Sequence, residues 1–172
     1  MLNIKLTAVV SFILAASTSL AQAAPTLMSG EWGVAACEAW NNTPKLADEL
    51  GESGWAENNG ERGHKVLQVY RNDCSSAPTA ELRIGFEDGK AKCIYGGAVE
   101  SSDLDSGVDY IMHGTSEHWN RMGSGKDGPM KAMMMGRLKF KGPKWEAMKN
   151  MGPFEGFLLL TGSVEADREI CP

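Results

Sequence analysis

The chain has 172 residues and carries 17 Lys and Arg against 22 Asp and Glu, a formal net charge of −5. A net acidic surface argues against a nucleic-acid-binding protein and against stable docking on anionic lipid. The length allows one ordinary domain with a hydrophobic core, once the N-terminal segment described next is set aside.

The N-terminal segment has the pattern of a secretory signal peptide. Lys5 supplies a positive charge, residues 6–16 form an apolar run too short to span a bilayer, and the small residues Ala21 and Ala23 flank Gln22. We place the cleavage site after Ala23, because Pro25 is a poor first residue for signal peptidase. The sequence therefore predicts a signal peptide over residues 1–23 and a single domain over residues 24–172, periplasmic or secreted.

The first half of the predicted domain contains helices and then a meander of strands. Residues 31–50 have helical periodicity, which the stretch 41–44 with its proline breaks into two helices. Runs rich in β-branched and aromatic residues follow, separated by turn signals. The predicted strands are 65–71, 80–87, 90–97 and 109–113.

The second half alternates short helices with one more strand. A helix over residues 116–122 has Thr115 as its cap, and a second helix opens at Pro129 and closes at Gly136. A strand over residues 137–141 follows. A last helical stretch runs from Pro143 and is interrupted at Gly152 and Pro153. This order predicts an α+β domain, with a five-stranded, mostly antiparallel sheet and helices on one face.

Four cysteines in an exported protein predict two disulfides. A turn at residues 87–89 sets Cys93 beside Ile84, whereas Cys74 lies about five strand residues, or roughly 17 Å, from that level. Disulfide partners need Cα atoms within about 7 Å of each other, so a Cys74–Cys93 bond is disfavoured. We therefore expect the bonds Cys37–Cys93 and Cys74–Cys171.

Methionines are concentrated in one short segment. Met130, Met133 and Met134 share one face of the predicted helix, and three explanations compete: core filling, a site for a soft metal, or a deformable apolar pocket. His113 and His118, with Met122 one turn beyond, could bind copper. The chain has no common metal-binding spacing and no nucleophile elbow, so nothing in it supports an enzyme.

Residues 109–160 resemble the sterol carrier protein family, most closely in "MMMGRLKFKG" and "WEAMKNM". The resemblance implies a five-stranded sheet covered by helices that enclose an apolar tunnel for a sterol, fatty acid or similar lipid. It implies no metal, no cofactor and no catalytic residues. By position, the implied lipid-binding lining is Trp119, Met122, Met130, Met133, Met134, Leu138, Phe140, Met148, Phe154, Phe157 and Leu158.

The resemblance therefore predicts a lipid carrier that contacts membranes transiently. The chain departs from the family by its export signal and its cysteine pairs. Cys171 is expected to pin the C-terminal tail over the tunnel mouth, which would hinder lipid exchange. The alternative prediction is a periplasmic copper-binding protein that uses His113, His118 and the methionines.

Overall fold

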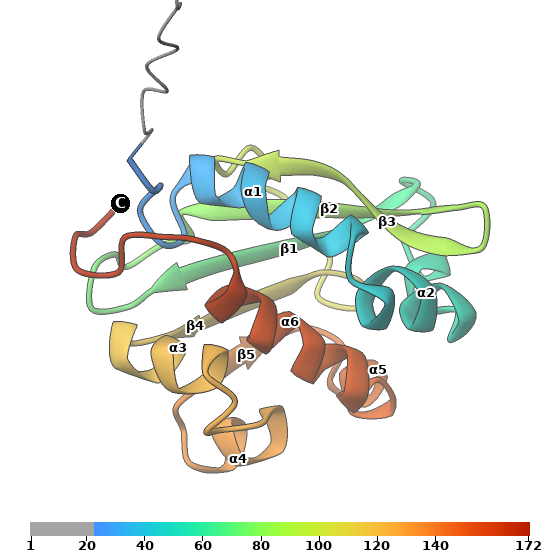
Figure 1. The fold of residues 1–172 in the computed structure, drawn as a ribbon. Helices are drawn as coiled ribbons and strands as arrows, with labels where there is room; N and C mark the ends of the chain where they lie inside the picture. The colour runs from blue at the N-terminus through green and yellow to red at the C-terminus, as the bar shows by residue number, and fades with distance from the viewer. Residues whose placement is uncertain (1–22) are drawn as a thin grey trace, which may run out of the picture.

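The strands form where the sequence predicts them, and they build a single five-stranded sheet. The computed structural model describes residues 23–172, so the predicted signal peptide lies almost entirely outside the described residues. Figure 1 shows the sheet with its helices. The strands are β1 (His64–Arg71), β2 (Ala80–Glu87), β3 (Lys90–Gly97), β4 (Tyr110–Gly114) and β5 (Lys139–Lys141).

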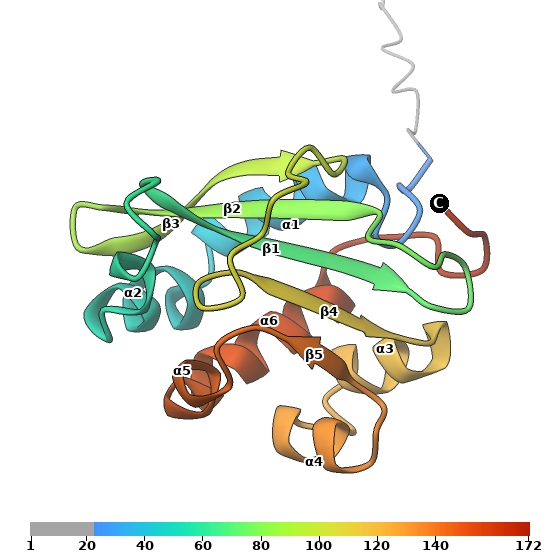
Figure 2. The same cartoon turned by 180° about the vertical axis from the view of Figure 1, so that it is seen from behind.

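The strand order in the sheet is β3-β2-β1-β4-β5. The β1–β4 pair is parallel, whereas the other three pairs are antiparallel. The parallel pair arises because residues 98–109, between β3 and β4, cross the back of the sheet, so that β4 starts at the same end as β1 (Figure 2). The predicted fold class, an α+β domain with a mostly antiparallel sheet, is confirmed.

Glu81 holds the crossing segment against the back of the sheet. Its carboxylate is fully buried and accepts hydrogen bonds from the Ser101 backbone N–H (2.9 Å), from Gln68 Nε2 (2.9 Å) and from Arg83 Nε (2.8 Å). Burial alone would raise the pKa of Glu81, but these hydrogen bonds outweigh it and lower the pKa. The buried Glu81 carboxylate thereby fixes the crossing segment to the sheet, together with a hydrogen bond from Gln68 Nε2 to the Ser101 carbonyl (2.8 Å).

The helices gather on the front of the sheet, and the core lies between the two layers (Figure 1). As predicted, Thr115 caps the third α-helix by accepting a hydrogen bond from the His118 N–H. The helices are α1 (Gly30–Asn41), α2 (Pro44–Glu52), the 3₁₀ turn η1 (Trp55–Glu57), α3 (Ser116–Gly123), α4 (Pro129–Met134), α5 (Lys144–Lys149) and α6 (Met151–Ser163).

Two predicted boundaries differ from the structure by two residues, and the strand limits elsewhere by at most one. The last helical stretch breaks at Asn150, because Pro153 falls in the first turn of α6, where its missing N–H costs no helical hydrogen bond. Strand β5 starts at Lys139 rather than at residue 137. The N–H groups of Arg137 and Leu138 both donate to the Ala132 carbonyl at the end of α4, so they are unavailable to the sheet.

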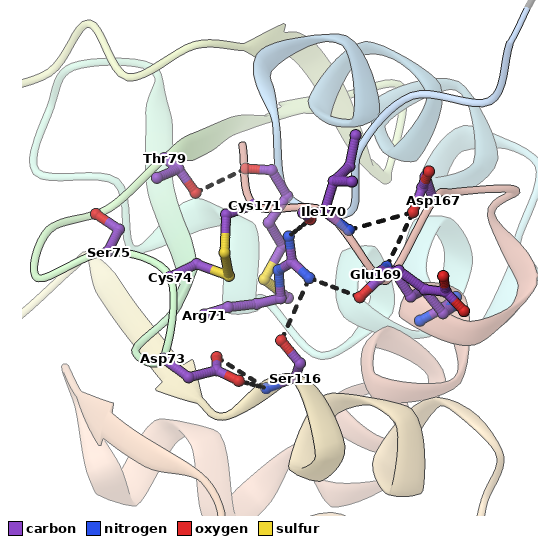
Figure 3. Close-up of a disulfide and its surroundings, with 12 residues drawn as sticks. Arg71, Asp73, Cys74, Ser75, Thr79, Ser116, Asp167, Glu169, Ile170 and Cys171 are labelled. Atoms are coloured by element: carbon purple, nitrogen blue, oxygen red, sulfur yellow. Dashed lines mark hydrogen bonds between the residues drawn. A yellow bond between two sulfur atoms is a disulfide. The ribbon is translucent and has the colours of Figure 1, made fainter.

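Both disulfides form in the expected pairing. Cys37–Cys93 joins α1 to β3, and Cys74–Cys171 joins the loop after β1 to the C-terminal tail. Figure 3 shows the buried Arg71 beside the second disulfide. Its guanidinium donates to the Arg168 carbonyl (2.9 Å) and to the Ile170 carbonyl, so the tail is held by side-chain hydrogen bonds as well as by the covalent link.

Within residues 23–172, every helix is too short or too polar to cross a bilayer.

Candidate functional site

An apolar cavity, the inner cavity, lies between the front of the sheet and helices α2, α5 and α6. Its volume is about 40 Å³, enough for a few water molecules and far too small for a lipid. Aromatic rings from several different elements meet around it, and the strands contribute the side chains that alternation points toward the helices. The lining residues are Trp40, Leu46, Leu50, Trp55, Leu67, Tyr110, Met112, Phe140, Ala147, Asn150, Pro153, Phe154 and Phe157.

A second and larger cavity, the outer groove, lies between α4, β5 and α5. Its volume is about 270 Å³, and several of its side chains are exposed to solvent. Methionine predominates in its wall, as expected for a surface that adapts to ligands of different shape. The lining residues are Met130, Met133, Leu138, Lys139, Phe140, Lys144, Ala147, Met148 and Met151.

Phe140 and Ala147 belong to both linings, so they form the partition between the inner cavity and the outer groove. Phe140 comes from the three-residue strand β5, and Ala147 comes from the six-residue helix α5. Joined, the two volumes amount to about 310 Å³, which reaches the lower end of the range for small-molecule sites, about 300 Å³. The two cavities would therefore reach ligand size only as one joined volume.

A polar cluster lies behind the aromatic rings at one end of the inner cavity. Tyr110 and Trp55, both in its lining, stack with their ring centroids 5.8 Å apart. The Tyr110 hydroxyl accepts a hydrogen bond from Trp55 Nε1 (3.1 Å) and donates one to Glu146 Oε2. Burial and the Glu146 carboxylate raise the pKa of Tyr110, so its hydroxyl stays protonated and keeps its hydrogen to donate.

Lys65 lies behind these rings and is 0 % exposed. Its ammonium donates to the Asn58 carbonyl (2.7 Å) and to Glu146 Oε2 (3.0 Å), and it lies 4.8 Å from the centroid of the Trp55 ring. Burial lowers the pKa of Lys65, and Glu146 opposes that shift. These polar groups satisfy one another behind the aromatic rings, and the lining of the inner cavity itself is apolar.

Seven of the eleven predicted lining residues lie in the inner cavity or the outer groove. They are Met130, Met133, Leu138, Phe140, Met148, Phe154 and Phe157.

The other four predicted residues lie in neither lining. Trp119, Met122 and Leu158 are buried where α3 and α6 pack together and against the sheet, so they belong to the core. Met134 is 79 % exposed and faces solvent. The structure therefore brings together the predicted residues of β5, α5 and α6 more completely than those of α3 and α4.

Most of the inner cavity was not predicted from the sequence. Leu67, Tyr110 and Met112 come from strands β1 and β4, and Trp40 and Trp55 come from the N-terminal helical segment. The signal was present in the strands, because residues two apart face the same side of a sheet and these apolar positions alternate. The polar cluster behind the rings could not be found in this way, since it depends on Glu146 of α5 lying next to Lys65 of β1.

The tail does not cover the tunnel mouth, contrary to expectation. Cys171 is bonded to Cys74 beside Arg71, at the end of β1, and the tail beyond residue 163 contributes no side chain to either lining. In Figure 1 the C-terminus and α5 lie at opposite ends of the molecule. The second disulfide therefore holds the tail away from both cavities.

The structure does not bring the predicted copper ligands together. The His113 ring stacks on Tyr70, with ring centroids 4.6 Å apart, whereas Met122 is fully buried in the core. Because Met112 faces the core, its neighbour His113 faces the back of the sheet. Among residues 23–172, no cluster of three or more His, Cys, Asp or Glu side chains could hold a metal ion.

Solved structures of similar fold include one described as the crystal structure of sterol carrier protein 2, with 18% identity, a TM-score of 0.51, and coverage of 80% of this chain and 98% of that chain. A Thermus thermophilus protein, described as possibly a sterol carrier protein, has 17% identity and a TM-score of 0.49, with 83% and 96% covered. At 18% identity the first likeness concerns the fold alone. No curated protein matches the chain significantly.

A profile of the SCP-2 sterol transfer family matches residues 48–155, which is more than half of the chain. The matched range contains every strand of the sheet and most of both cavity linings. The chain therefore belongs to the SCP-2 sterol transfer family.

Proposed function

We propose that this protein is a carrier that binds an apolar lipid, such as a sterol or a fatty acid, and moves it across an aqueous compartment. The observation that carries the proposal is the pair of neighbouring apolar cavities that share Phe140 and Ala147, within the fold of a lipid-transfer family. The lipid occupies the joined pocket after α5 shifts. The protein acts by binding and release rather than by catalysis.

The energy of such binding comes from burial of the lipid's apolar surface. Removing about 400 Å² of apolar surface from water contributes about 10 kcal/mol, which offsets the usual costs of association for a small ligand. Phe154 and Phe157 supply aromatic surface at the inner end, and flexible methionines supply apolar surface at the outer end.

We further propose that the protein is exported and works in the periplasm or outside the cell. The predicted signal peptide supports this, and so do the two disulfides, which persist in oxidising compartments. An exported carrier would meet a membrane at each end of its path, so transient membrane contact is part of the proposal.

The test is native mass spectrometry of the protein purified from the periplasm without detergent, followed by organic extraction. The expected result is a stoichiometric lipid, whose identity names the cargo. Ala147→Phe fills the partition from both sides and is expected to yield protein without lipid, with an unchanged near-ultraviolet circular dichroism spectrum as the control for folding. A wild-type protein that stays free of lipid when offered sterols and fatty acids would contradict the proposal.

A further inference from the structure

Positive charge is concentrated in one segment of this acidic protein. Residues 126–149 contain seven Lys and Arg and two acids, a formal charge of +5, so the remaining residues together carry −10. The segment comprises α4, β5 and α5, which lie together at the edge of the sheet opposite β3 (Figure 2). The whole-chain charge therefore conceals a cationic surface.

Most of these cations have no ion-pair partner among residues 23–172. Asp127 is buried and pairs with Arg121, Lys131 and Arg137. Five other lysines of the segment are exposed and form no ion pair with any described residue. They are Lys126, Lys139, Lys141, Lys144 and Lys149.

The same segment carries the three most exposed large apolar side chains of the described residues. Met134, Trp145 and Met135 are 79 %, 69 % and 61 % exposed, and Met130 and Met148 are about half exposed. Contiguous exposed apolar surface marks an interaction site, and tryptophan beside lysine is typical of the membrane–water interface. We call these five lysines and five apolar residues the docking rim.

The docking rim adjoins the outer groove and contributes four of its lining residues. Met130 and Met148 belong to both the rim and the groove lining, and so do Lys139 and Lys144. A surface that docks through the rim would thus meet the groove directly.

We propose that the docking rim binds the surface of an anionic phospholipid bilayer. The lysines match the negative headgroups, and Trp145 and the methionines enter the interface between headgroups and acyl chains. Docking through the rim places the outer groove against the membrane that supplies or receives the lipid. The biological role of the rim thus rests on the proposed carrier function. Binding through the rim also revises the expectation, drawn from net charge, that anionic lipid is disfavoured.

The first test is co-sedimentation of the purified protein with vesicles of phosphatidylcholine alone or of equal parts phosphatidylcholine and phosphatidylglycerol. Binding is expected only to the anionic vesicles and is expected to fall as salt is raised. Lys141→Gln with Lys149→Gln should weaken it about 30-fold, since each lysine near such a surface contributes about a fivefold factor. The matched control is Lys90→Gln with Lys92→Gln on β3, at the other edge of the sheet, which should bind as the wild type does.

The second test locates the contact by fluorescence. Of the five tryptophans, all within the described residues, only Trp145 is exposed. Anionic vesicles with brominated acyl chains should therefore quench part of the emission of the wild type and none of the emission of Trp145→Phe.

Equal weakening in the Lys90/Lys92 control, or undiminished quenching in Trp145→Phe, would overturn the docking rim. So would self-association that Lys141→Gln with Lys149→Gln abolishes while vesicle binding is absent, because the rim would then bind a second copy of the chain. The outcomes separate from those of the carrier proposal. If lipid co-purifies but the protein does not bind vesicles, only the docking-rim proposal is contradicted. If the protein binds vesicles but carries no lipid, only the carrier proposal is contradicted.

Discussion

Glu146 in α5 and Lys65 in β1 form an ion pair beside the inner cavity, with Glu146 Oε2 3.0 Å from Lys65 Nζ. The Lys65 side chain is fully buried, whereas that of Glu146 is 19% exposed. Ala147, the partition residue, directly follows Glu146. The ion pair therefore links the short helix α5, which lies between the two cavities, to the central strand β1.

Glu146→Gln should destabilise the protein by about 2 kcal/mol, because it leaves the buried Lys65 ammonium without its counter-charge. The loss is smaller than the roughly 3–5 kcal/mol of a fully buried pair, since Glu146 keeps some contact with water. Urea unfolding followed by circular dichroism measures the change. The control is Glu146→Gln combined with Lys65→Met, which removes both charges and should recover most of the loss. Equal destabilisation of the single and double variants would show that the ion pair is not the cause.

Two neighbouring methionines should report on different steps. Met133 lines the outer groove, so Met133→Asp should weaken binding of a fluorescent fatty acid at least about tenfold, since it removes apolar contact and adds a charge. Met134→Asp is the matched control: it lies outside both linings and should leave this affinity unchanged, yet reduce binding to anionic vesicles. If Met133→Asp and Met134→Asp changed the fatty-acid affinity equally, the outer groove would not be part of the binding site.

Loss of the tail disulfide should affect stability and leave lipid affinity unchanged. Cys74→Ser with Cys171→Ser opens a link across a sequence separation of 97 residues. The free energy of unfolding should fall by about 5 kcal/mol, on the loop-entropy account of cross-links. Chemical unfolding and fatty-acid titration of the same sample measure both quantities. A large loss of affinity in the folded variant would mean that the tail contributes to the pocket after all.

Asp127 should give the protein a stability that acid removes. Hydrogen bonds from Arg121, Lys131 and Arg137 hold the pKa of Asp127 well below its usual range. The unfolded chain takes up this proton near the ordinary value of about 4, and the folded chain only at lower pH. The contribution is thus complete above about pH 4 and is lost as the pH falls further.

The variant Asp127→Asn tests this pH dependence. Its melting temperature should be lower than that of the wild type at neutral pH and should fall less steeply in acid. Differential scanning calorimetry at several pH values measures both proteins. A constant difference between the two melting temperatures from neutral pH to strong acid would show that the charge of Asp127 does not stabilise the fold.

The sheet was predictable because local signals determine most of it. The turn at Asp88 and Gly89, both with positive φ, places Cys93 opposite Ile84 as the spacing predicts. The parallel partner of β4 was not predictable, because residues 98–109 have no regular pattern and their position depends on the buried Glu81. Local sequence indicates strands and turns, whereas a long crossing depends on distant contacts.

The site was predictable only in part, for a related reason. Helical spacing correctly groups the apolar side chains of α3, but it does not indicate what covers them. Gly123 and Gly162 let α3 and α6 approach so closely that Trp119 and Met122 become core residues. In α4, Met133 and Met134 lie three and four residues after Met130, so helical spacing places both on its face. Met134 is nevertheless exposed to solvent, because the helix ends there.

The partition between the two cavities is built from the smallest elements of the fold, β5 and α5, while no disulfide-bonded cysteine belongs to either lining. The residues that limit the size of the bound lipid are thus separate from the disulfides that stabilise the fold. Substitutions at positions such as 140 and 147 can change the size of the accepted molecule with little effect on the scaffold. Among proteins of this architecture that bind different lipids, sequence differences should therefore concentrate in β5 and α5. The elements that the disulfides join should vary little.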